Sequence, residues 1–214
     1  MDLGKVNTKG ERTKNMILDK AACLFSSKGY NAVTMKDICD ETGLSRGGLY
    51  RYFGSTAEIM IEIMDREQEE ADSTSGHNSP VRADPIKLLD EFIEIHTRYI
   101  GSPYVGLDSA MLQFAMTDHN GMLAYKKRLF NVCRRIENLI RFGQARDVFK
   151  KGDPYDMAFH IMMTIGGIRN MVFVEDMDLD TIMVQLDFIR KILLKDKYYK
   201  ENGNGQHEKE GTSG

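Results

Sequence analysis

The segment LSRGGLYRYF, residues 44–53, combines two adjacent glycines with a cluster of long side chains that carry polar tips. A glycine in a helix interior costs about 0.5–1 kcal/mol relative to alanine, so Gly47 and Gly48 need a reason beyond folding. Because glycine leaves the backbone bare, a large partner can approach it closely. The arginine and tyrosine side chains beside the glycines supply hydrogen-bond donors. This combination favours a partner rich in acceptors, such as nucleic acid.

The residues around this segment predict two short helices joined by a glycine. Thr34 is expected to cap a helix that ends before Gly43, and Ser45 to begin a second helix that runs through Phe53. Such a pair is a helix-turn-helix. In that arrangement the second helix enters the major groove of DNA, and the first crosses the phosphate backbone. The alternative is that the two short helices only pack against their neighbours.

The distribution of charge favours DNA over packing alone. Residues 1–56 carry nine Lys/Arg and six Asp/Glu, although the whole chain has a net charge of −3. The run 42–57 contains no acidic residue, and a carboxylate at a groove-facing helix end would repel phosphate. The position three residues after Ser45, where a capping box would place Glu, is Gly48. This choice leaves the helix N-terminus free for an anion.

The sequence ILDKAACLFSSKGYNAVTMKDICDETGLSRGGLYRYFGSTAEIM resembles the DNA-binding domain of the TetR family of bacterial transcriptional regulators. The resemblance covers residues 14–64. It implies that Arg46 reads a base edge, that the two glycines admit DNA closely, and that the tyrosines hold phosphates. Leu49 and Phe53 are expected in the core. The DNA-binding residues implied are Thr34, Lys36, Arg46, Gly47, Gly48, Tyr50, Arg51 and Tyr52.

One position departs from the family pattern. Thr56 stands where the family commonly has a lysine at the start of the next helix. One phosphate contact fewer is therefore expected, with a salt dependence shallower by about one counterion.

The rest of the chain predicts further helices and no strand, so the fold class is all-α. Apolar residues recur at helical spacing from residue 85 to about residue 196, and the stretch 72–84 is rich in Ser, Gly and Pro. The expected organisation is a helix-turn-helix DNA-binding domain over 1–56 with an N-terminal arm over 1–10, a connecting helix over 57–71, a loop over 72–84, a larger ligand-binding and dimerisation domain over 85–200, and a disordered tail over 201–214.

The second domain holds most of the 14 methionines of the chain. Methionine fills irregular cores, and it also makes a soft lining for an apolar or aromatic ligand. The resemblance implies that the C-terminal helices enclose an inducer pocket. The histidines of this region lack metal-ligand spacing, so neither a metal nor a cofactor is expected. The pocket candidates are His96, Tyr99, Met111, Gln113, Phe114, His119, Tyr125 and Met163.

The two final long helices are candidates for dimerisation. Gly166 and Gly167 lie within an apolar helix, where small residues permit close approach of another helix. The resemblance implies a homodimer held by a four-helix bundle, which would read a pseudo-palindromic operator in double-stranded DNA. The alternative is that both helices close the core of their own chain. The interface candidates are Gly166, Gly167, Ile182, Leu186, Ile189 and Leu193.

Together these features predict a DNA-binding repressor that a small apolar or aromatic ligand releases from its operator. The alternative is an activator, or a regulator controlled by a partner protein without a small ligand. An enzyme is disfavoured, because GxSxG, P-loop, HExxH, CxxC and dinucleotide motifs are absent from the sequence. The three cysteines lack disulfide-framework spacing, and the sequence shows no signal peptide and no membrane-length apolar run, so a cytoplasmic protein is expected.

Overall fold

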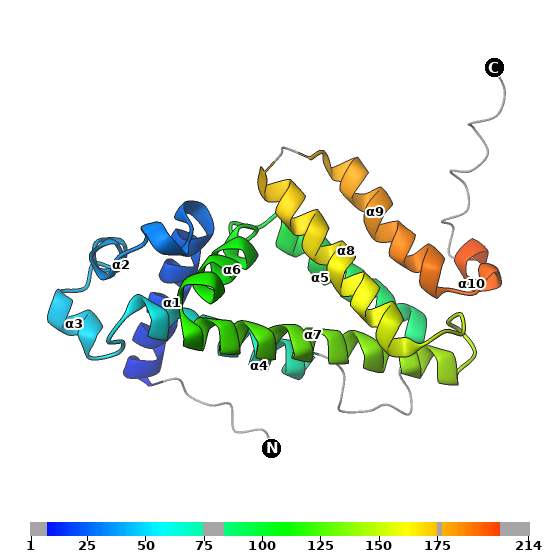
Figure 1. Cartoon of the computed structure of the whole chain (residues 1–214), viewed down its shortest axis with the longest axis horizontal. Coiled ribbons are helices and arrows are strands. Elements are labelled where there is room, and N and C mark those ends of the chain that lie inside the picture. The colour runs from blue at the N-terminus through cyan, green and yellow to red at the C-terminus, as the bar shows by residue number, and fades with distance from the viewer. Residues whose placement is uncertain (1–7, 75–83, 175–176, 202–214) are drawn as a thin grey trace. The chain divides into compact units, whose positions relative to one another are not determined.

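The computed structural model describes residues 8–74, 84–174 and 177–201, which form ten α-helices (Figure 1). The all-α prediction is confirmed; within these ranges the only β feature is an isolated antiparallel bridge between Phe149 and Leu194. The predicted arm and tail fall mostly outside the described residues, although Lys9 already belongs to a helix capped by Thr8. The helices are α1 Lys9–Lys28, α2 Met35–Thr42, α3 Arg46–Tyr50, α4 Thr56–Thr74, α5 Pro85–Ile100, α6 Leu107–Thr117, α7 His119–Ala145, α8 Pro154–Val174, α9 Leu179–Leu193 and α10 Asp196–Glu201.

The chain divides into two compact units, and neither is continuous in sequence. The first unit comprises Met1–Ser75 and Ser102–Arg128, and the second comprises Gly76–Gly101 and Leu129–Gly214. The first unit therefore contains α1 to α4 together with α6 and the beginning of α7. The sequence-based boundaries, in contrast, assigned every residue after 84 to one larger domain.

The core of the first unit forms where α6 packs against α1. Ile17 and Phe25 of α1 and Phe114 of α6 are each 0% exposed, and they belong to one apolar cluster. Buried Ser26 adds a polar contact, because its hydroxyl accepts a hydrogen bond of 3.0 Å from the backbone N–H of Gly106. Burying several large apolar side chains contributes about 1.5–3 kcal/mol each. This packing attaches α6 to the helix-turn-helix.

The core of the second unit lies among α5, α8 and α9, which pack on one another (Figure 1). Each helix contributes one apolar face, with residues at the i, i+3 and i+4 spacing of an amphipathic helix. The side chains on these faces are almost fully buried, and they include Leu89, Ile93, Ile161, Ile165, Ile182, Leu186, Ile189 and Leu193.

The end of α7 differs from the sequence prediction, which continued this helix to residue 150. The helix ends at Ala145, and Asp147 takes a left-handed conformation with φ of 59°. The chain then folds back so that the N–H groups of Val148 and Phe149 both donate to the carbonyl of Gly143. A Cβ at Gly143 would lie 2.2 Å from the Phe149 ring. The buried phenyl ring thus stops the helix where local periodicity predicted its continuation.

Candidate nucleic-acid interface

The ends of α2 and α3 are fixed by their capping residues. Thr34 accepts a hydrogen bond of 3.3 Å from the N–H of Asp37, and Gly43 closes α2 in the left-handed region with φ of 71°. Ser45 then accepts a hydrogen bond of 3.2 Å from the N–H of Gly48. Ser45 therefore occupies one donor of the α3 N-terminus that the sequence analysis had left free for an anion. The result is a short turn that presents α3 directly after α2.

The helix α3 is shorter than predicted. It spans Arg46–Tyr50, and the chain continues in a turn in which Tyr52 and Phe53 donate to the carbonyl of Leu49. Leu49 is 0% exposed and Phe53 is 4% exposed, which confirms that both belong to the core. These two anchors determine which side of α3 faces outward.

The glycines of α3 are not required by the fold. Neither has a positive φ. A Cβ at Gly47 would meet no atom within 4 Å, and one at Gly48 would meet the Ser45 hydroxyl oxygen at 3.3 Å. Alanine at Gly47 would favour the helix, so the chain itself gains nothing from glycine there. The bare backbone at this position is useful only to a partner outside the chain.

The exposed cations gather at the same place. Lys36, Arg46 and Arg51 are exposed, and among the described residues no acidic side chain forms an ion pair with any of them. The other lysines near the helix-turn-helix are neutralised instead, through the pairs Lys14–Glu62, Lys20–Glu41 and Lys28–Asp37. Positive charge is therefore available at α2 and α3 and largely compensated elsewhere on this unit.

The two tyrosines differ in exposure. Tyr50 is 53% exposed, whereas Tyr52 is half-buried and packs against the core. Tyr50 thus presents its whole ring on the surface beside the exposed cations. Tyr52 presents less of its surface to a partner.

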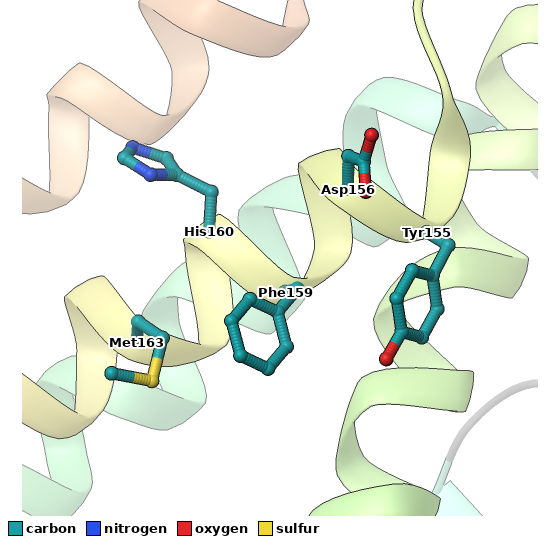
Figure 2. A pocket seen from close by; sticks show the side chains of 5 residues that line it. All are labelled: Tyr155, Asp156, Phe159, His160 and Met163. Carbon is teal, nitrogen blue, oxygen red and sulfur yellow. The ribbon is translucent and has the colours of Figure 1, made fainter.

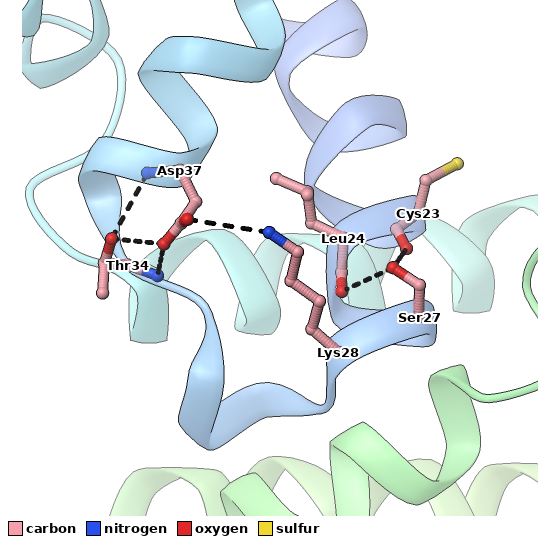
Figure 3. Close-up of polar contacts among 6 residues, drawn as sticks. All are labelled: Cys23, Leu24, Ser27, Lys28, Thr34 and Asp37. Atoms are coloured by element: carbon pink, nitrogen blue, oxygen red, sulfur yellow. Dashed lines mark hydrogen bonds and ion pairs between the residues drawn. The ribbon is translucent and has the colours of Figure 1, made fainter.

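Thr34 has a structural role that the sequence reasoning missed. Its hydroxyl and its backbone N–H both donate to the Asp37 carboxylate, which also lies 3.7 Å from the Lys28 ammonium group (Figure 3). The hydrogen bonds from Thr34 lower the pKa of Asp37. The T-x-x-D spacing in the sequence is the signal that could have revealed this capping box. In this geometry both donors of Thr34 are already used within the chain.

The predicted pocket residues do not form one cluster. Met111 and Phe114 are fully buried in the core of the first unit, where Tyr125 also packs. The side chain of Gln113 covers Gly29 at the end of α1, and His119 is exposed. These five candidates belong to the DNA-binding unit, so the structure corrects their assignment to a common pocket with the residues of α5 and α8.

The other pocket candidates lie in the second unit. His96 and Tyr99 on α5 both contact Arg169 of α8: a guanidinium nitrogen lies 2.7 Å from His96 Nδ1, and the guanidinium carbon lies 3.9 Å from the centre of the Tyr99 ring. Because arginine is always a donor, His96 Nδ1 must accept in this contact. Sequence reasoning missed Arg169, since nothing in a helical pattern pairs residues of α5 and α8 in advance.

Met163 lies instead on the outer face of α8. It lines an open depression together with Tyr155, Asp156, Phe159 and His160, whose side chains all project from this one helix (Figure 2). Met163 is 59% exposed and Phe159 is 47% exposed. Among the described residues, α8 alone has the length and composition of a membrane span, and one such helix is weak evidence for a membrane.

The predicted dimer residues divide into two groups. Ile182, Leu186, Ile189 and Leu193 are buried in the core of their own unit, so they cannot also contact a partner while this core is intact. Gly166 and Gly167, in contrast, border open space, since a Cβ at either would meet nothing within 4 Å. The structure therefore moves the expected interface to the exposed apolar side chains, which on α8 and α9 are Tyr155, Phe159, Met163, Met171, Phe173, Val174, Leu179, Met183, Val184 and Phe188.

A helix-turn-helix with an exposed, cationic second helix, attached to an all-helical second unit, defines a DNA-binding regulator. Residues 17–63 match the model of the bacterial regulatory proteins of the tetR family. The HTH-type transcriptional repressor KstR of Mycobacterium tuberculosis is 32% identical over 158 residues, which are 74% of this chain and 67% of KstR. The chain belongs to the TetR family of bacterial transcriptional regulators.

Solved structures share the fold. A transcriptional regulator from Saccharomonospora viridis in complex with choline has a TM-score of 0.73 at 21% identity, covering 86% of this chain and 98% of that one. A SmeT–triclosan complex has a TM-score of 0.72 at 22% identity, covering 86% of this chain and 93% of that one. These similarities extend over both units.

Proposed function

We propose that this regulator is a homodimeric repressor that reads a pseudo-palindromic operator and is released from it by a small apolar or aromatic ligand. The observation that carries DNA reading is the surface of α3. There Gly47 borders open space beside the exposed, unpaired side chains of Arg46 and Arg51. A guanidinium can bind guanine through two hydrogen bonds, and a bare backbone lets the helix lie deep in the groove. A cytoplasmic location follows from this role.

Within this site the structure favours different roles for different side chains. Arg46 precedes both glycines at the N-terminus of α3, where a recognition helix contacts base edges. Tyr50, Arg51 and Lys36 are exposed and suit phosphate contacts. Thr34 holds α2 in place through Asp37, so its contribution to DNA binding is to orient that helix.

Selection of duplexes from a random DNA pool tests the operator. The wild-type protein should enrich an inverted repeat and retard it in a gel-shift assay at low salt. Arg46→Ala should bind the same duplex more weakly and discriminate less at one position of each half-site. Failure of the wild-type protein to enrich any duplex would exclude the proposed function.

The support for a dimer is the outer surface of the second unit. The exposed apolar side chains of α8 and α9, with Gly166 and Gly167 among them, form a surface of the kind that marks a protein interface. On α8, Phe159 and Met163 are one helical turn apart, and the glycines follow on the same helix. A second copy of the chain offers the same face, as twofold symmetry requires. Sedimentation analysis should show a dimer at micromolar concentration.

Support for a ligand comes from two sources. The structural relatives in complex with choline and triclosan bind small molecules on the same fold. In this chain, His96, Tyr99 and Arg169 bring polar groups together among the apolar helices of the second unit, the combination that orients a small ligand. A thermal-shift screen should find compounds that raise the melting temperature and release the selected duplex. Compounds that stabilise the protein without releasing DNA would favour control by a partner or an activator.

A further inference from the structure

Tyr30 connects α6 with the end of α1. It follows Gly29 in a short 3₁₀ turn over Tyr30–Ala32. The centre of its ring lies 4.6 Å from that of Phe114 on α6 and 5.6 Å from that of Phe25 on α1. Because both phenylalanines are 0% exposed, the Tyr30 ring is held against the core on two sides. Tilted aromatic pairs of this kind add about 0.5–1.5 kcal/mol each beyond the area that they bury.

The hydroxyl of Tyr30 reaches a different element. It forms a hydrogen bond with the side chain of Thr56, the first residue of α4. Burial raises the pKa of Tyr30, the Thr56 contact counteracts that rise, and the nearby carboxylate of Asp118 between α6 and α7 adds to it. One residue therefore contacts α1 and α6 through its ring and the start of α4 through its hydroxyl.

The start of α4 is continuous with the DNA-reading turn. Ser55 caps α4 by accepting a hydrogen bond of 3.2 Å from the N–H of Glu58, and the Glu58 carboxylate accepts one of 2.7 Å from the N–H of Gly54. Phe53, immediately before, is anchored in the core. These contacts leave little freedom between Thr56 and Tyr52, so a displacement of Thr56 is transmitted to the C-terminal end of α3.

We propose that Tyr30 is a positioning residue for operator binding, which holds the turn between α3 and α4 in its reading position through Thr56. Threonine at position 56 then has a role of its own: its side chain faces Tyr30, where the family's lysine would extend toward a phosphate. The proposal rests on the proposed function, because it requires an operator. It assigns no DNA contact to Tyr30, which acts entirely within the first unit.

The test is a double-mutant cycle on operator affinity, with the duplex that the wild-type protein selects from a random pool as the probe. Tyr30→Phe removes only the hydroxyl, and Thr56→Val removes only its partner. Each should weaken binding about three- to tenfold, the range that one net hydrogen bond allows. The double variant should bind no more weakly than either single variant, because both remove the same contact. Thr56→Ser, which keeps a hydroxyl, should bind like the wild type.

Tyr104→Phe is the matched control. Tyr104 is also partly buried against the core of the first unit, and its hydroxyl contacts Cys23 within α1 rather than α4. This variant should keep its operator affinity even where its melting temperature falls as much as that of Tyr30→Phe. Unchanged affinity in Tyr30→Phe, or an equal loss in Tyr104→Phe, would overturn the positioning role while leaving DNA binding intact. A wild-type protein that selects no duplex would overturn both proposals.

Discussion

The helices α3 and α8 both expose groups that their own fold does not use, but the groups are of opposite kinds. On α3, Gly47 borders open space beside exposed cations and the ring of Tyr50. On α8, Gly166 and Gly167 border open space beside exposed apolar side chains such as Met163. A bare backbone in either helix permits close approach, and the neighbouring side chains indicate what approaches. The surface of α3 suits a polyanion, and the surface of α8 suits an apolar protein surface.

This difference also separates two uses of glycine within the chain. A Cβ at Gly143 would collide with the Phe149 ring at 2.2 Å, and one at Gly29 would lie 2.7 Å from a side-chain oxygen of Gln113. Those glycines serve internal packing. The glycines of α3 and α8 that border open space serve an outside partner, and substitutions distinguish the two cases.

The largest expected effect comes from a charge on the apolar surface of α8. Met163→Lys places an ammonium group where a partner helix would bury it, at a cost that an interface cannot offset. The variant should sediment as a monomer, and its operator affinity should fall by about a hundredfold or more because the two half-sites are no longer bound by one linked molecule. Met116→Lys is the control, since Met116 is 75% exposed on α6 in the first unit. A Met163→Lys protein that stays dimeric would contradict this interpretation of α8.

The next effect concerns the cation at the start of α3. Arg46→Ala should weaken binding to the selected duplex by about 10- to 150-fold, the equivalent of about 1–3 kcal/mol for a base-reading pair. Binding to unrelated DNA should fall much less, and fluorescence anisotropy with both duplexes measures the difference. Lys126→Ala on the exposed side of α7 removes one charge as a control. Equal losses on both duplexes would make Arg46 a phosphate contact instead.

A smaller effect, with opposite signs for folding and for binding, is expected at Gly47. Gly47→Ala should raise the free energy of unfolding by up to about 1 kcal/mol, because alanine favours the helix and meets no neighbouring atom. The same methyl group should lower operator affinity about tenfold by keeping the helix from the DNA, which corresponds to about 1.4 kcal/mol. Urea denaturation and anisotropy provide the two measurements.

Gly143→Ala supplies the contrast with Gly47. It should lower the free energy of unfolding by about 1–3 kcal/mol through overpacking, since its Cβ would meet the Phe149 ring. A Gly47→Ala variant that is both more stable and fully active in binding would remove the argument from bare backbone on α3.

The smallest expected effect concerns Thr56. Thr56→Lys restores the cation that the family commonly has, so the slope of log affinity against log salt should steepen by about one unit. A titration of the selected duplex between low and moderate salt measures this slope. Thr56→Gln is the neutral control of similar length. A slope unchanged by the lysine would show that this corner lies away from phosphate.

Sequence patterns predicted local features well and long-range partners poorly. The caps at Thr34 and Ser45 and the buried positions of Leu49 and Phe53 follow from a few neighbouring residues, and the structure shows all four. The apolar stripe of α9 was correctly seen as a buried face, but periodicity does not say what covers it. Ile182 and Leu186 are covered by their own unit, whereas the sequence analysis assigned them to a dimer partner.

The same limit explains the pocket prediction. Met111 and Phe114 lie on an apolar helix that follows the loop, so a sequence-based division places them in the second domain. Their burial depends on contacts with α1, more than 80 residues away in the chain for Phe25 and Phe114. Nothing in the local pattern of α6 indicates that pairing. Arg169 was missed for a similar reason, because its contacts to His96 and Tyr99 join separate helices.

The attachment of α6 to α1 also determines when the DNA-binding unit can fold during synthesis. A nascent chain that ends near residue 75 has made the whole helix-turn-helix but lacks Phe114, and Gly106 is not yet available to donate to Ser26. Domains fold as units as the chain leaves the ribosome. Pulsed hydrogen exchange should therefore show α1 protected together with α6. The reading helix gains its native support only after residue 128 has been made, although it is encoded in the first quarter of the chain.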